Sequence, residues 1–407
     1  MQNRIRTIDP RAFFVPCASH TVNLVVNDSV HCSLDAVKFF DIVQNLYVFV
    51  SSSTNRWTIY KKNVPNLTLK PLSETRWESR IDALKPLKNN LGDIYEALIE
   101  ISEDGTAEVK VTAESLGNKI LDFKFICSLL IWFDVLEKIN IASKYLQGQS
   151  VSLSAGITIL ENTSQYIAKL RTDEKFNQYI FAAEAIALDL DIPSTFPEQS
   201  SLRSRRRKKM YTDEAEETIL DPKLSFKVNF YYKILDQAIT SINERFELLK
   251  AHNNLFSFLY NINEAHKLEN LKNLCNQLDL ALSNNESKDL NGEELYQEIL
   301  ILSPLVKADQ SSLDVLNFIF KSHLEQLFPN SVVAIKILNT LPVTVASGER
   351  SFSKLKLIKT YLRTTMTQDR LVDLSILSIE KELVEALEYD DMIEEFAKLK
   401  ARKVQFV

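Results

Sequence analysis

Apolar residues recur at helical spacing along most of the chain. Val22, Val25, Val26 and Val30 form one such stripe, and a second runs from Val37 to Val50. Because residues three and four positions apart share one face of a helix, these stripes predict amphipathic helices. The same pattern predicts further helices within residues 74–101, 113–146, 153–166 and 224–282.

One short segment near the start has a different pattern. Residues Ala12 to Val15 are apolar or aromatic and are followed by Pro16, which predicts a short strand. The chain has seven glycines in 407 residues, few for a fold that needs many tight turns. We therefore predict a mainly α fold.

The last part of the sequence predicts three short amphipathic helices. The first carries Glu349 in its first turn, the second is capped by Thr367, and the third begins near Asp390. Short amphipathic helices cannot each bury an apolar face alone. We expect them to pack on each other, on the preceding domain or on a second chain.

Composition excludes several classes of protein. The net charge of −6 argues against a protein that coats nucleic acid, so any DNA contact must come from local patches. The four cysteines are scattered, which favours a reducing compartment over a disulfide framework. The most apolar run, Phe123 to Phe133, is too short to span a bilayer, and we expect no membrane partner.

Cys17 and His20 form a C-x-x-H pair, and His31 and Cys32 follow on the same helical stretch. A helical rise of about 1.5 Å per residue separates the two pairs by roughly 15 Å, too far to converge on one zinc ion. We therefore predict no metal site from these residues.

Two other patterns are candidates for contact with nucleic acid or an import receptor. Arg76 and Trp77 could clamp a phosphate and stack on a base, although a tryptophan at a helix start also packs commonly in a core. A basic run could direct nuclear import, or it could be a solvated loop; it contains Arg203, Arg205, Arg206, Arg207, Lys208 and Lys209.

Glu349 is the third residue of the string SGERSFSKLKLIKTYLR. An acid at a helix start is commonly a surface residue that compensates the helix dipole. The string, however, resembles the region of hAT-superfamily transposases that carries their last catalytic Glu, which maps onto Glu349. In such enzymes two Asp and one Glu hold a pair of Mg²⁺ ions for strand cleavage.

The resemblance continues elsewhere and is closest to the group of zinc finger MYM-type protein 1-like proteins. It implies that Cys17 and His20 are a structural motif and that Arg76 and Trp77 face DNA. It also implies a dimerization region over Leu341 to Phe406. The dimerization residues that we name from it are Leu341, Phe352, Leu355, Ile358, Leu371, Leu374, Leu377 and Phe396.

The resemblance also implies a domain order. We expect an RNase H-like remnant over residues 1–55 and a helical insertion domain over 56–325, with a disordered basic and acidic loop at about 192–222. The C-terminal dimerization region would then cover 326–407.

The sequence departs from the family at the catalytic acids. The two family Asp fall before the segment that begins this chain, and Asp9 does not match either of them. One carboxylate cannot hold two divalent ions. We therefore expect an N-terminally truncated, non-catalytic protein without a cofactor, in which Mg²⁺ would bind only if a longer product supplied the missing acids.

The favoured function is therefore homodimerization through the C-terminal region, with DNA as a further partner and no small-molecule substrate. One alternative is a nuclear DNA-binding regulator, and another is a fragment of an active hAT transposase. We expect a nuclear location, with a cytoplasmic one as the alternative.

Overall fold

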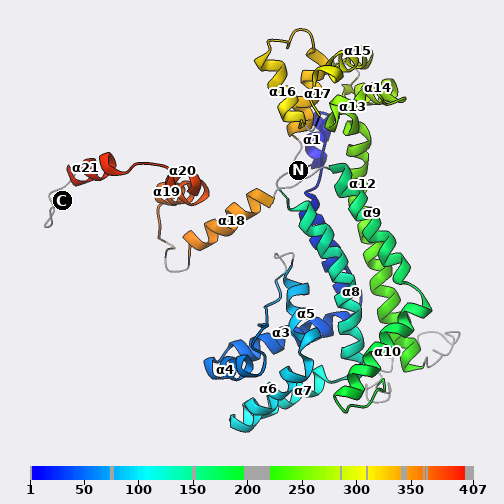
Figure 1. Cartoon of the computed structure of the whole chain (residues 1–407), viewed down its shortest axis with the longest axis vertical. Coiled ribbons are helices and arrows are strands. Elements are labelled where there is room, and N and C mark those ends of the chain that lie inside the picture. The colour runs from blue at the N-terminus through cyan, green and yellow to red at the C-terminus, as the bar shows by residue number, and fades with distance from the viewer. Residues whose placement is uncertain are drawn as a thin grey trace. The chain divides into compact units, whose positions relative to one another are not determined.

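Two compact units make up the chain, Met1–Thr344 and Val345–Val407, called here the main unit and the C-terminal unit. The computed structural model (Figure 1) describes residues 2–73, 78–148, 153–196, 221–284, 287–308, 310–340, 346–360, 363 and 365–398. Its described residues are mainly helical, which confirms the predicted fold class at that level.

The first part of the main unit contains the predicted helical segments, and it also contains three helices that were not predicted, over 2–8, 54–63 and 173–189. Its helices are α1 (Gln2–Ile8), α2 (Ala18–His31), α3 (Leu34–Ser51), α4 (Thr54–Asn63), α5 (Ser79–Asn89), α6 (Leu91–Asp104), α7 (Ala107–Ile120), α8 (Phe123–Leu146), α9 (Leu153–Leu170) and α10 (Asp173–Asp189).

The second part of the main unit is built on one long helix. It comprises α11 (Pro222–Phe226), the π-helix η2 (Lys227–Tyr232), α12 (Lys233–Tyr260), α13 (Ile262–Ala265), α14 (Leu271–Ala281), the hairpin β1 (Ser283–Asn284) and β2 (Ser287–Lys288), α15 (Gly292–Leu302), the 3-10 turn η3 (Ser303–Leu305), α16 (Ser312–Lys321) and α17 (Pro329–Thr340).

The prediction of a strand over Ala12 to Val15 is wrong, because these residues form no β pairing. Among the described residues, the only paired strands are β1 and β2. The Phe13 ring instead packs edge-on against Phe256, with 5.4 Å between the ring centroids. An extended segment becomes a strand only where a neighbouring strand offers backbone hydrogen-bond partners. Here the segment is held instead by the hydrophobic contact of Phe13 with Phe256.

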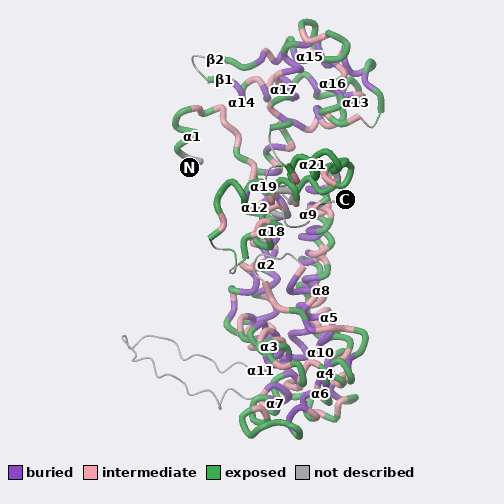
Figure 2. The backbone as a smooth tube through the Cα atoms, turned by 90° about the vertical axis from the view of Figure 1, so that its left-hand side faces the viewer, coloured by how far each residue is buried: buried purple, intermediate pink, exposed green. Residues whose placement is uncertain are grey.

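Four long helices of the main unit, α2, α8, α9 and α12, run side by side and form its central bundle (Figures 1 and 2). Trp132 of α8 is fully buried, and its ring centroid lies 5.1 Å from that of Phe40 in α3. A polar contact also ties α2 to α12, since Arg245 pairs with Asp28 at 2.7 Å. The bundle therefore has one continuous apolar core with a charged contact at its edge.

The helix α12 takes part in two hydrophobic cores. The core of the bundle extends along it as far as Leu249. A second core begins at Phe256 and is built with α13 to α17. The helix α12 therefore connects the second core directly to the bundle.

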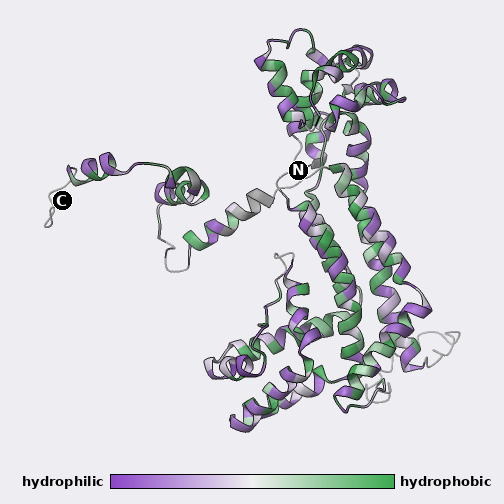
Figure 3. Cartoon of the chain, viewed as in Figure 1, coloured by the Kyte–Doolittle hydropathy of each residue, from purple (hydrophilic) through white to green (hydrophobic). Residues whose placement is uncertain are grey.

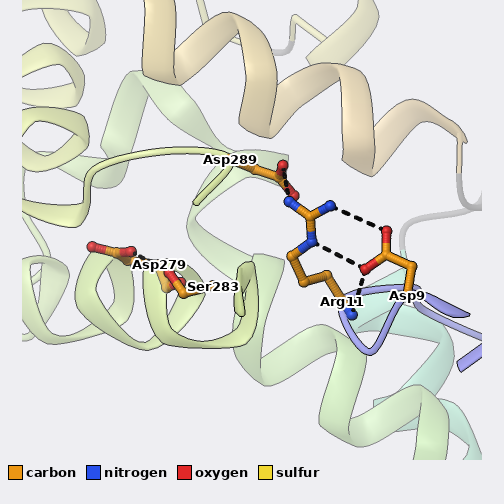
Figure 4. Close-up of polar contacts among 5 residues, drawn as sticks. All are labelled: Asp9, Arg11, Asp279, Ser283 and Asp289. Carbon is orange, nitrogen blue, oxygen red and sulfur yellow. Dashed lines mark hydrogen bonds and ion pairs between the residues drawn. The ribbon is translucent and has the colours of Figure 1, made fainter. Parts of the chain in front are cut away.

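Polar contacts join the N-terminal segment to the hairpin that follows α14. Figure 4 shows the Arg11 guanidinium between two carboxylates, with Nε 3.0 Å from Asp9 Oδ1 and Nη1 2.5 Å from Asp289 Oδ1. The hydrogen bonds from Arg11 hold the pKa of Asp9 below its usual value. This contact links residues 278 positions apart in the sequence.

A buried carboxylate fixes the start of α17 on α15. Glu298, which is 8% exposed, accepts hydrogen bonds from the backbone N–H of Asn330 at 3.1 Å and of Ser331 at 2.7 Å. The Asn330 side chain also donates to Glu298 at 2.7 Å and accepts from the Asn291 backbone at 2.8 Å. The free N–H groups of a helix start are thus satisfied by a charged acceptor from another helix.

The C-terminal unit contains α18 (Ala346–Ile358), α19 (Gln368–Ile379), α20 (Lys381–Glu385) and α21 (Asp390–Lys398). The helix α21 begins at Asp390, as predicted. Thr367 occupies the predicted N-cap position of α19, but its side chain makes no capping hydrogen bond. The short helix α20 was not predicted. The helix α18 packs on α19, where Lys354 Nζ donates to the Ser378 carbonyl at 2.7 Å.

We predict that His252 makes the main unit sensitive to acid. This α12 residue is 3% exposed, stacks on Phe256 at 4.7 Å, and has no hydrogen-bond partner for either ring nitrogen within the described part of the chain. Burial lowers its pKa to about 4. Because this value lies below that of the unfolded chain, stability is lost as the pH falls from about 6.5 to 4.

The loss between pH 7 and pH 4 should be about 3 kcal/mol of unfolding free energy, from the size of the pKa change. Measured by urea unfolding, the unfolding free energy of His252→Phe should fall between pH 7 and pH 4 by about 3 kcal/mol less than that of the parent protein. The matched control is His20→Phe at an exposed position of α2. If His252→Phe and His20→Phe have the same pH dependence, the assignment to His252 is wrong.

We also predict that Glu298→Ala lowers the unfolding free energy by about 3 kcal/mol, because it leaves two buried backbone N–H groups without an acceptor. The control Glu293→Ala removes an exposed acid of the same helix that pairs with Lys272, and should cost less than about 1 kcal/mol. Equal losses in the two variants, measured by denaturant titration, would show that Glu298 has no special role.

Candidate self-association surface

The C-terminal unit exposes large apolar side chains on all four of its helices or beside them. Phe352 is 71% exposed and Phe396 is 55% exposed. Figure 3 shows hydrophobic residues along α18 and α19, and Figure 2 shows α21 as exposed. The other exposed apolar residues of this unit are Leu357, Val372, Ile376, Leu377, Ile379, Leu383, Leu387, Tyr389, Met392 and Ile393.

The C-terminal unit has almost no interior. Among its described side chains only Leu371, at 8% exposure, is buried. Helices of this length gain most of their stability from packing an apolar face rather than from their own hydrogen bonds. The unit therefore presents apolar faces without the core that would normally cover them.

The residues that we predicted for dimerization lie in three environments. Phe352, Leu377 and Phe396 are exposed, and they are available for contact with another chain. Leu355, Ile358 and Leu374 are half-buried, and Leu371 is the buried residue. Leu341 lies outside the described residues.

Sequence reasoning missed several exposed apolar residues of the same unit, including Leu357, Ile376, Leu383 and Met392. A signal for one set was present, since Val372, Ile376 and Ile379 follow each other at spacings of four and three and lie on one face of α19. Leu383 belongs to the short α20, whose five residues give too little periodicity to be found this way.

The ion pairs of the C-terminal unit contribute little to its stability. Lys381 pairs with Glu385, and Lys398 with Glu394, both at 3.2 Å and both exposed. Such surface pairs contribute about 0–1 kcal/mol each. The surface of this unit is therefore suited to burying apolar side chains against a partner.

Most of the remaining predicted site residues lie outside the described part of the chain. Glu349 belongs to the first turn of α18, but its side chain lies outside the described part, as do Arg76, Trp77 and the basic run from Arg203 to Lys209.

Cys17 precedes α2 and is half-buried, whereas His20 is exposed within that helix. The described residues contain no cluster of three or more His, Cys, Asp or Glu side chains arranged for metal binding. They also include no helix whose length and apolar content would carry it across a membrane.

Comparison with known proteins finds a family region that covers the end of the main unit and the first part of the C-terminal unit. Residues 295–383 match the hAT family C-terminal dimerisation region. This match begins within α15, includes the Glu298 contact and α16 to α19, and ends within α20. It therefore covers helices of both units.

Two curated proteins are similar over most of the chain. The human 52 kDa repressor of the inhibitor of the protein kinase is 24% identical over 352 residues, which is 82% of this chain and 43% of the human protein. Its mouse counterpart is 23% identical over 353 residues, 82% of this chain and 44% of the mouse protein. The chain thus spans less than half the length of these relatives.

No solved structure matches the chain. Both of these relatives are 52 kDa repressors, and the similarity to zinc finger MYM-type protein 1-like proteins stays a prediction. At the coarser level, the chain carries an hAT C-terminal dimerisation region within residues 295–383.

Proposed function

We propose that this chain is a non-catalytic, hAT transposase-derived protein that forms a homodimer through its C-terminal unit. The observation that carries the proposal is the row of exposed apolar side chains on α18 to α21 beside a single buried leucine. The match of residues 295–383 to a dimerisation region supports the same conclusion from the sequence.

Energetics support association through this surface. Complete burial of a Leu, Ile or Phe side chain contributes about 1.5–3 kcal/mol. Phe352, Ile376 and Phe396 each expose half or more of their area in the single chain. A second copy offers the same apolar residues, so one self-complementary contact can cover both sets.

We predict that Ile376→Glu combined with Phe396→Glu weakens dimerization by about a hundredfold, because two carboxylates would have to be buried. Sedimentation at micromolar concentration should show a dimer for the parent protein and a monomer for this variant. The control Leu188→Glu changes an 84% exposed leucine of α10 and should leave the dimer intact.

Truncation before Leu341 removes the C-terminal unit and should also give a monomer. A parent protein that is monomeric throughout the micromolar range would remove the proposed function. A truncated chain that still dimerizes would instead place the contact in the main unit.

The absence of catalysis is a separate part of the proposal. It rests on the resemblance, which assigns one family acid, Glu349, to these 407 residues. A single carboxylate cannot hold the two metal ions of strand cleavage. Mg²⁺-dependent DNA cleavage by this chain that disappears in Glu349→Ala would contradict it. The RNase H-like remnant over residues 1–55 is likewise a proposal based on the resemblance.

We propose, as a second function, that the dimer acts as a nuclear DNA-binding regulator. The similar human protein is named as a repressor, which favours a regulatory role. Under this proposal Arg76 and Trp77 contact DNA and the basic run from Arg203 to Lys209 directs nuclear import.

We expect DNA binding that weakens as salt rises and that is lost when Arg76→Ala and Trp77→Ala are combined. The control is Arg56→Ala, which removes a half-buried arginine of α4 that lies over the Phe49 ring. This variant should bind DNA as the parent protein does. Fluorescence anisotropy that gives the same affinity for the parent protein and the double variant would exclude these two residues.

A further inference from the structure

A cavity of about 660 Å³ opens between α3, α7 and the start of α8 in the main unit. Its apolar lining includes Phe39 and Phe125, which are buried and lie 4.9 Å apart between ring centroids. Ile42 and Val111 extend this lining, and Val111 is 66% exposed. The volume is within the usual range for pockets that hold small organic molecules.

The three acids that line the cavity already have partners. Asp35 pairs with Lys124 at 2.8 Å, and Glu114 lies 4.0 Å from Lys110. Asp122 accepts hydrogen bonds from the backbone N–H groups of Lys124 and Phe125, as the N-cap of α8. Their negative charge is therefore largely compensated within the protein.

Two lysines of the cavity are in a different situation. Lys38 of α3 and Lys119 of α7 line it, and both are exposed. Neither is among the lysines that pair with a carboxylate in the described part of the chain. The cavity thus combines two buried aromatic rings with two lysines that pair with no carboxylate in the described part of the chain.

We propose that this cavity binds an amphipathic organic anion, with its apolar body on Phe39 and Phe125 and its anionic group at Lys38 and Lys119. A neutral apolar ligand would leave the lysine charge unused, and an inorganic anion would leave the aromatic floor uncovered. Asn118 of α7 also lines the cavity and can donate a hydrogen bond to the anionic group.

Naphthoate, an aromatic ring system with one carboxylate, is a suitable probe. Because the apolar C-terminal unit can also take up such a molecule, the readout must be local to the cavity. The variant Ser115→Cys places a thiol in its wall, and mass spectrometry of the modified peptide follows its reaction with N-ethylmaleimide. Ser154→Cys, at an exposed position of α9, is the matched control.

Naphthoate should slow labelling of Ser115→Cys at least threefold and leave Ser154→Cys unchanged. Adding Lys38→Met and Lys119→Met should raise the naphthoate concentration needed for half the effect about tenfold, whereas Lys169→Met on α9 should not. Neutral naphthylmethanol should protect Ser115→Cys only at concentrations about tenfold higher than naphthoate.

Two results would overturn the proposal. Equal labelling rates with and without naphthoate would show that the cavity does not bind this class of molecule. Equal protection by naphthoate and naphthylmethanol, or protection that survives loss of both lysines, would show that the anionic group is not recognised.

Discussion

The exposure of apolar faces on α18 to α21 is the physical constraint on which this account depends. A helix of nine to thirteen residues has too few internal hydrogen bonds to be stable in water alone, and it needs an apolar surface to pack against. In the C-terminal unit only Leu371 is buried among the described side chains, while Phe352, Ile376 and Phe396 are exposed. Under the proposed function a second copy would cover these faces, because it would supply apolar surface of the same kind.

The main unit satisfies the same constraint internally. Its long helices cover one another, and α12 contributes to both of its hydrophobic cores. Contacts between charged and polar groups then fix the positions of element ends that apolar packing does not hold. Arg11 holds the N-terminal segment to Asp289, and Glu298 holds the start of α17. The two units therefore differ in how far their apolar faces are covered within the chain, and under the proposed function a second copy would cover those of the C-terminal unit.

Much of the fold could be predicted because helical periodicity is a local property. The stripe from Val37 to Val50 and the cap at Thr367 both correspond to observed helices. The strand predicted over Ala12 to Val15 failed because a strand depends on a distant partner, which a local pattern cannot reveal. The short α20 was missed because five residues contain little more than one turn.

The candidate sites were less accessible from the sequence. Periodicity identifies an apolar face but does not say whether that face ends up in a core or on the surface, so Leu371 and Phe396 could not be distinguished. The cavity near Phe39 depends on side chains from three helices, and its free lysines become evident only once Asp35 and Lys124 are seen to pair. His252 likewise has no motif, and its low pKa follows from burial alone.

Amide hydrogen exchange at two protein concentrations tests the central claim most directly. If the apolar faces of α18 to α21 are covered by a second copy, backbone amides in these helices should exchange slowly at high concentration and rapidly after dilution below the dimer dissociation constant. Amides of α2, α8 and α12 should be protected equally at both concentrations. Concentration-independent exchange in α18 to α21 would contradict the account, because these helices would then be stable, or unstable, without a partner.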